Sequence, residues 1–192
     1  MIKLESKKSN IICIVMAIVL LVSIINSVYI NMQNQKFKNG DIQQMYSEWY
    51  ALYCMSEYVD RFINGGSNDG ERYILYVNQV CHHFKISITP SELNTNLSNL
   101  LILSYDPLFS NLAKEEETLN KEKAIELLKK MNSDLLAISK DIIEMSEEEK
   151  EKLLDQSSSK YDEMNTRVKD FSNKYNKLVD DYFRTYSEYV SH

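Results

Sequence analysis

Residues 11–30 read IICIVMAIVLLVSIINSVYI and contain no charged side chain, with Ser23, Asn26 and Ser27 as their clearly polar members. Twenty residues of α-helix rise about 30 Å, which matches the thickness of a bilayer's hydrocarbon core. The rest of the chain is polar and follows helical periodicity. The sequence therefore predicts a single transmembrane helix over residues 11–30 that tethers a helical domain.

A cleaved secretory signal peptide is the alternative interpretation of this N-terminus. Such a signal has a basic start, an apolar segment of about 7–15 residues and a small-residue cleavage site. The basic start is present in Lys3, Lys7 and Lys8, but the apolar run is longer, and Ile25-Asn26-Ser27 is a poor cleavage site. These features favour a retained signal-anchor.

Basic residues near the ends of a span set its orientation, because they are enriched on the cytoplasmic side. Three lysines precede the apolar stretch, and two follow it before Arg61. This bias predicts a short cytoplasmic tail of residues 1–10 and an extracytoplasmic helical-bundle domain of residues 31–192, and hence a single-pass protein of the cell membrane. Ser23 and Ser27 are small enough to permit self-association of two spans, although we favour their placement at the membrane interface.

The composition outside the span limits the class of partner and of fold. Residues 31–192 carry 19 basic and 27 acidic side chains, a net charge of −8. Such a surface repels a phosphate backbone, so we expect no nucleic-acid partner. Four glycines and two prolines in 192 residues argue against a fold with many tight turns. The domain is therefore expected to be all-α.

Three cysteines occur, one of them, Cys13, inside the apolar stretch. Cys54 and Cys81 lie on two expected helices joined near Gly65-Gly66, and an antiparallel hairpin would bring them within one turn of each other. A disulfide is one interpretation if the compartment is oxidising. Two buried free thiols are the simpler interpretation, because cysteine packs as a small apolar residue.

Apolar spacing predicts the helices of the domain. The first continues from the span, with a weak point at Asn39-Gly40, and ends at Gly65-Gly66. The second begins near Asp69. The motif Thr89-Pro90-Ser91-Glu92 predicts a third, short helix capped by Thr89 and ending before Ser104, with a further turn at Asp106-Pro107. We expect the region from Ile86 to Leu112 to be the least regular part.

The apolar positions of the first helix are Ile42, Met45, Trp49, Leu52, Val59 and Ile63, with Ser56 interrupting the row.

The clearest periodicity lies in the C-terminal half of the chain. Apolar residues spaced alternately by four and three form a full heptad seam: Ala124, Leu128, Met131, Leu135, Ile138, Ile142 and Met145. The break after this helix is expected either at the capping box of Ser146 and Glu149 or at residues 155–159, and we favour the second. A last helix is expected from about Lys160 to Val190. Every seventh residue of it is bulky and apolar or aromatic, interleaved with Met164, Phe171 and Leu178: Tyr161, Val168, Tyr175, Tyr182 and Tyr189.

These elements predict an all-α fold: an N-terminal single transmembrane helix followed by an antiparallel helical bundle of about four helices with coiled-coil-like heptads. The tyrosines of the last helix are bulky for a tight two-stranded coil, so they favour packing within one chain.

No catalytic motif stands out. The adjacent residues His82 and His83 point about 100° apart on a helix and cannot share one metal. The acidic runs at residues 115–117 and 147–149 are interpreted as solvated helix starts. We therefore expect no enzyme activity, cofactor or metal. Aromatic residues form the one candidate site, for a ligand or partner, provided that the last helix returns towards the anchor: Tyr46, Trp49, Tyr50, Tyr53, Tyr175, Tyr182 and Tyr186.

The leading hypothesis is a non-enzymatic interaction or scaffold protein at the outer face of the membrane, which binds a membrane or envelope protein. The alternative is an extracytoplasmic bundle that senses a small ligand and signals through a partner protein, since ten cytoplasmic residues cannot hold an output domain. A hydrolase or metal enzyme is the least favoured hypothesis. Fold-level analogy supports each of these only weakly.

Overall fold

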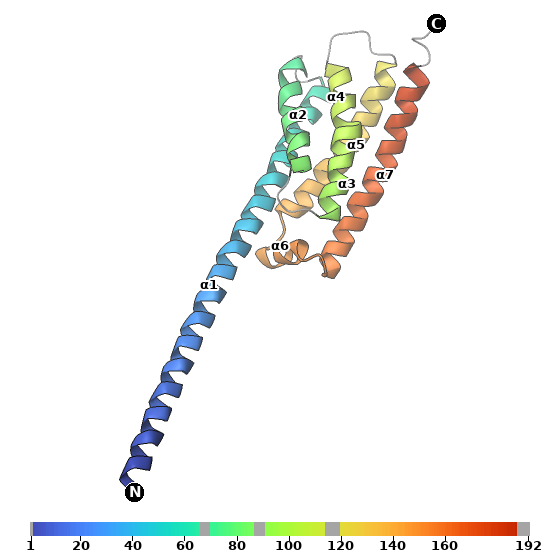
Figure 1. Cartoon of the computed structure of the whole chain (residues 1–192). Helices are drawn as coiled ribbons and strands as arrows, with labels where there is room; N and C mark the ends of the chain where they lie inside the picture. Colours follow the sequence, from blue (N-terminus) through green and yellow to red (C-terminus); the bar gives the residue numbers. More distant parts are fainter. Residues whose placement is uncertain (1, 66–69, 87–90, 114–119, 188–192) are drawn as a thin grey trace. The chain divides into compact units, whose positions relative to one another are not determined.

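A computed structural model describes the backbone of residues 2–65, 70–86, 91–113 and 120–187 (Figure 1). Within these ranges, the side chains of residues 2–14, 17, 71, 85–86 and 186–187 are not described. The described backbone is helical and contains no strand, which confirms the prediction of an all-α chain with a helical bundle. The chain divides into residues 1–41 and residues 42–192, and each unit is described by itself.

The first unit is part of helix α1 (Ile2–Ile63), which continues through the predicted weak point at Asn39-Gly40. Residues 18–22 are all large and apolar, and each is 58–61% exposed. Because five consecutive residues make more than one helical turn, this surface is apolar in every direction. Among the residues that the structure describes, no helix is long and apolar enough to cross a membrane.

In the second unit, α1 buries the apolar row that its sequence predicts, from Ile42 to Val59, and leaves Ile63 half-buried. Gly65 follows the helix with φ +78°, in the left-handed region that glycine adopts at helix ends. Helix α2 (Gly70–Ile86) runs antiparallel to α1. Trp49 packs edge-to-face on Phe84 at one end of the pair, and Tyr58 stacks on Tyr73 at the other. Asp69 lies outside the described residues.

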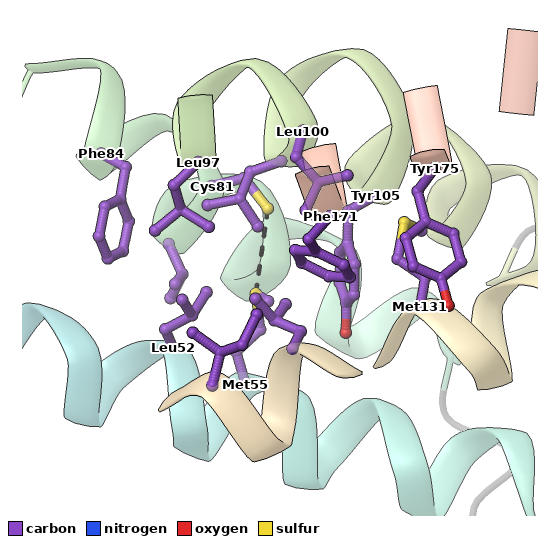
Figure 2. Packing of buried hydrophobic residues seen from close by; sticks show 14 of the residues in the cluster. Leu52, Met55, Cys81, Phe84, Leu97, Leu100, Tyr105, Met131, Phe171 and Tyr175 are labelled. Atoms are coloured by element: carbon purple, nitrogen blue, oxygen red, sulfur yellow. Dashed lines mark hydrogen bonds between the residues drawn. The ribbon is translucent and has the colours of Figure 1, made fainter. Parts of the chain in front are cut away.

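Cys54 and Cys81 are free thiols, so the structure has no disulfide between these helices. The Cys81 thiol is fully buried and donates to Met55 Sδ at 3.9 Å (Figure 2). Burial raises the pKa of this thiol well above its usual range. Cys81 is therefore a core side chain that packs between α1 and α2. The Cys13 side chain lies outside the described residues.

After α1 and α2, the third long helical segment, or rod, of the bundle is longer and more regular than the sequence predicts. It consists of α3 (Glu92–Leu100), the π-helical turn η1 (Leu101–Tyr105) and α4 (Asp106–Ala113). The cap is Ser91, whose side chain accepts from the Asn94 N–H at 3.1 Å, so the prediction that Thr89 caps this helix is wrong. The expected irregular region contains some of the deepest core residues: Leu97, Leu100, Leu101, Tyr105, Leu108 and Phe109, all at 0% exposure.

The π-helical turn explains why the helix continues past Pro107. A proline has no N–H to donate, and in a regular helix its ring collides with the carbonyl four residues earlier. Here the Asp106 N–H donates to the carbonyl of Leu101, five residues back, so the turn is wider just before the proline. Asp106-Pro107 was expected to begin a separate turn, but it continues the rod.

The C-terminal half contains α5 (Lys121–Ile143), α6 (Glu147–Leu154) and α7 (Ser159–Ser187). Both predicted breaks are present, because the short helix α6 stands between them. Ser146 and Glu149 form the predicted capping box. The heptad seam of α5 is buried from Ala124 to Ile142, as predicted. On α7 the structure buries Val179 and leaves Leu178 43% exposed, so the buried row continues through Val179 after Met164 and Phe171.

Contacts between the rods give their directions. Helices α5 and α7 are antiparallel, since Asp141 pairs with Arg167 at 2.6 Å and Asp134 pairs with Lys174 at 3.3 Å. In contrast, α7 runs parallel to the third rod: the Leu93 N–H donates to the Tyr161 hydroxyl, and Ser104 Oγ donates to Asn176 Oδ1. The described part therefore has five long rods rather than about four, and the third rod and α7 are neighbours that run parallel (Figure 1).

The additional rod reverses the expected direction of the last helix. With about four rods, α7 would return to the end of the bundle that contains Ile42. Because the third rod also crosses the bundle, α7 begins at that end, where Tyr161 and Trp49 line one cavity. Its later residues lie alongside the first half of α5, and Lys129 in that half donates to Asn64 Oδ1 at the other end of α1.

A chain of polar groups connects three rods inside the core. The Tyr105 hydroxyl donates to Asn132 Oδ1 at 2.5 Å, and Asn132 Nδ2 donates to the Ser56 carbonyl at 2.9 Å. All three residues are at most 1% exposed. Burial raises the pKa of the Tyr105 hydroxyl well above its usual range, so it remains a donor. This network links α1, η1 and α5.

Gly70 is required at the start of α2 by close packing, and its replacement by alanine is expected to destabilise the bundle. An added Cβ would lie 2.5 Å from Phe62 Cε2 and 3.1 Å from Ala113 Cα. Overpacking of this kind lowers the free energy of unfolding by about 1–3 kcal/mol. Urea denaturation of the full chain measures the effect. Gly40→Ala is the control, because nothing lies within 4 Å of its added Cβ. A Gly70→Ala variant as stable as the parent chain would contradict this packing.

Candidate functional site

The structure separates the aromatic residues that the sequence grouped as one candidate site. Trp49 lines a cavity with Tyr161 near the Ile42 end of the bundle. Tyr182 lines a different groove, of about 280 Å³, with Leu127 and Leu178. The side chain of Tyr186 lies outside the described residues. The two aromatic groups therefore do not form a common pocket, because α7 runs away from the Ile42 end.

Tyr175 and Tyr182 of α7 belong to the core of the bundle. The Tyr175 hydroxyl donates to Asp134 Oδ2 at 2.7 Å, and its ring packs edge-to-face on Phe171. Burial and this hydrogen bond raise the pKa of Tyr175. Tyr182 is also buried and contacts Phe183 edge-to-face. The hydrogen bond of Tyr175 to Asp134 joins α7 to α5, and Tyr182 is part of the same buried core.

Three tyrosines of α1 form a surface of stacked rings, here named the tyrosine face: Tyr46, Tyr50 and Tyr53, of which Tyr53 is half-buried. The rings of Tyr46 and Tyr50 stack with centroids 5.9 Å apart, and Tyr50 stacks on Tyr53 at 6.3 Å. Tyr46 is 36% exposed and Tyr50 is 48% exposed. In contrast, the neighbouring Trp49 is buried against Phe84.

Charged groups surround the tyrosine face. Lys150 Nζ lies 4.9 Å from the centroid of the Tyr46 ring. The Tyr53 hydroxyl donates to Glu57 Oε1 at 2.9 Å, and this hydrogen bond raises the pKa of Tyr53. The Cys54 thiol raises the pKa of Tyr50. Tyr50 and Tyr53 are thus protonated at neutral pH, and their hydroxyl groups can both donate and accept hydrogen bonds.

A second candidate site is a small polar cavity that sequence reasoning missed. Its volume is about 30 Å³, and side chains from α1, α6 and α7, together with the start of α3, line it. The polar lining residues are Gln44, Glu48, Ser91, Asn94, Gln156 and Tyr161, and the apolar ones are Met45, Trp49, Leu93, Leu153 and Leu154.

Glu48 is the charged side chain of this cavity and is only 6% exposed. Its Oε1 accepts from Gln44 Nε2 at 3.1 Å and lies 3.6 Å from His83 Nε2 on α2. Glu48 and His83 also line a groove of about 240 Å³ between α1 and α2. The sequence contains a signal for this residue. Glu48 stands three residues after Met45 and four before Leu52, and this spacing places Glu48 at a core position of the helix.

The other titratable motifs do not gather into a site. No group of three or more histidine, cysteine, aspartate and glutamate side chains could hold a metal within the part of the chain that the structure describes. Glu147, Glu148 and Glu149 form the exposed first turn of α6, as the sequence predicts. A hydrogen bond from the Ser146 backbone lowers the pKa of Glu149. The run at residues 115–117 lies outside the described residues.

Comparisons of the chain with protein-family models, with curated proteins and with solved structures found no match. Two features of the described residues are therefore the candidate sites: the exposed tyrosine face and the polar cavity beside Glu48.

Proposed function

We propose that the chain is a single-pass membrane protein whose extracytoplasmic bundle binds another protein of the membrane or envelope through the tyrosine face. In this proposal residues 11–30 span the bilayer, residues 1–10 are cytoplasmic, and the protein catalyses no reaction.

The proposed anchor is supported by apolar surface on all sides of one helix. A helix that packs on a protein needs one apolar stripe, whereas a helix surrounded by lipid is apolar in every direction. Residues 18–22 are large, apolar and more than half exposed all round α1. They lie at the centre of a twenty-residue stretch without charge. Lipid is the surrounding that covers such a surface most simply.

The proposed docking function rests on one observation, the stacked and exposed rings of the tyrosine face. Tyrosine is enriched at protein interfaces because its ring contributes contact area while its hydroxyl forms hydrogen bonds. Rings that already stack on one another lose less conformational freedom when a partner binds. The anchor would keep this surface near the membrane, so a membrane or envelope protein is the partner proposed.

Photo-crosslinking in native membranes tests this function. A photoreactive phenylalanine analogue at Tyr50 should crosslink one discrete membrane protein, and the same group at the exposed position Lys177 on α7 should not. In co-purification experiments, the double variant Tyr46→Gln/Tyr50→Gln should lose that protein while its circular dichroism stays unchanged.

Two results would contradict the proposal. The first is equal crosslinking from position 50 and position 177, which would show that the tyrosine face has no preference for a partner. The second is a crosslink from position 50 to another copy of this chain, which would indicate self-association through the face.

A further inference from the structure

We infer that Asn64 is a site of spontaneous deamidation, in which its side-chain amide is converted to a carboxylate with assistance from Lys129. The sequence places a glycine directly after an asparagine at Asn39-Gly40 and at Asn64-Gly65. In such a pair the backbone nitrogen of the glycine can attack the side-chain carbonyl of the asparagine, because glycine has no Cβ to obstruct the approach. This inference is independent of the proposed function, since neither pair belongs to the tyrosine face.

The helix protects the first of these pairs. Both asparagines are exposed, so exposure does not distinguish them. Asn39 and Gly40 lie inside α1, where each backbone N–H is held in a hydrogen bond to the carbonyl four residues earlier. Helical dihedral angles also hold the glycine nitrogen away from the side-chain carbonyl carbon of the preceding residue. Attack at Asn39 therefore requires local unfolding in the interior of a long helix.

The second pair lies just past the end of the same helix. α1 ends at Ile63, and Gly65 has a φ of +78°, outside the helical region. The Gly65 N–H donates to the carbonyl of Phe62 at 3.2 Å. A hydrogen bond in a terminal turn opens at a small cost in free energy, and its opening frees the attacking nitrogen. Asn64 is therefore the asparagine at which this reaction meets the lower barrier.

Lys129 activates the carbonyl group that is attacked. Its ammonium group, on α5, donates to Asn64 Oδ1 at 3.2 Å. When the Gly65 nitrogen attacks Asn64 Cγ, negative charge develops on this oxygen, and a neighbouring cation stabilises that charge. Lys129 is exposed, so solvent screens the interaction and the acceleration is modest.

The reaction requires water as its only co-reactant. The Gly65 nitrogen forms a bond to Asn64 Cγ and loses its proton, while the bond from Cγ to the side-chain nitrogen breaks and ammonia leaves. Water then opens the cyclic imide at either carbonyl, which yields aspartate or isoaspartate at position 64. In the aspartate product, the contact with Lys129 becomes an ion pair between α5 and the end of α1.

Incubation of the full chain in detergent micelles, in mildly alkaline buffer, tests the inference. Peptide mass spectrometry measures the conversion of Asn64 and of Asn39 in the same sample. Asn64 should convert at least about tenfold faster, because attack at Asn39 first requires opening of the helix. Equal rates at the two positions would overturn the inference. Absence of conversion at Asn64, over a time in which the urea-denatured chain is converted, would overturn it as well.

A pair of variants tests the role of Lys129. Lys129→Gln removes the positive charge and keeps a polar side chain, so conversion of Asn64 should slow by about threefold, as expected for an exposed contact. Lys130→Gln is the matched control, because Lys130 is the next residue of α5 and pairs with Glu126 at 2.6 Å. This control should convert Asn64 at the rate of the parent chain. A parental rate in Lys129→Gln, or equal slowing by both substitutions, would contradict activation by Lys129.

Discussion

Replacing Leu20 and Ile24 together by arginine is expected to release the chain from membranes. Both residues lie near the centre of the proposed span, one helical turn apart. An arginine at the centre of a membrane helix is unfavourable by about 2.5–3.5 kcal/mol on insertion scales, so two are unfavourable by about 5–7 kcal/mol. Extraction of membranes with alkaline carbonate measures the change as the fraction of chain that remains in the pellet.

The control for this experiment is Leu20→Ala/Ile24→Ala. It shortens the same two side chains but adds no charge, so the chain should stay in the pellet. If the arginine variant remained in the pellet as completely as the alanine variant, lipid would not be what surrounds residues 18–22.

Asn132→Ala is expected to cause a large loss of stability in the bundle. Asn132 is 1% exposed and joins the Tyr105 hydroxyl to the Ser56 carbonyl. Its removal leaves the buried Tyr105 hydroxyl without an acceptor and creates a cavity. The two effects together should lower the free energy of unfolding by about 3–5 kcal/mol. Urea denaturation of the full chain, followed by circular dichroism, measures this loss.

A double-mutant cycle separates the hydrogen bond from the cavity. Tyr105→Phe in the parent chain leaves Asn132 Oδ1 unsatisfied, so it should lower the free energy of unfolding by about 1–3 kcal/mol. In the Asn132→Ala background the same substitution removes a hydroxyl that already lacks its acceptor, and the loss should disappear. Equal losses in both backgrounds would show that the two side chains are not coupled.

Much of the helical pattern follows directly from the spacing of apolar residues. The α5 seam from Ala124 to Ile142 is predicted residue by residue, because a fully amphipathic helix has one way to bury its stripe. The continuation of the third helix through Pro107 is not predicted, because proline normally ends a helix and the π-helical turn that accommodates it has no sequence signature. That one omission reversed the expected direction of α7 and with it the placement of Tyr175 and Tyr182.

In the candidate sites, too, features that depend on local spacing could be predicted from the sequence, and features that depend on contacts between distant helices could not. Tyr46, Tyr50 and Tyr53 follow one another at intervals of four and three, so a common helix face could be predicted. Glu48 at a core position could also have been recognised. The cavity beside Glu48 could not be predicted, because it forms only where α6 and the start of α3 meet α1. Those contacts depend on the angles between successive helices, which the sequence does not specify.

Cysteine labelling in intact cells tests most directly whether residues 11–30 span a membrane with the bundle outside. Two variants, Ser9→Cys and Ser157→Cys, are treated with a membrane-impermeant maleimide, and each signal is compared with that of the parent chain. Ser157 is exposed in the turn between α6 and α7. Ser157→Cys should be labelled in intact cells and Ser9→Cys only after the membrane is permeabilised. Labelling of position 9 but not of position 157 in intact cells, or recovery of the chain in the soluble fraction, would contradict the proposed topology.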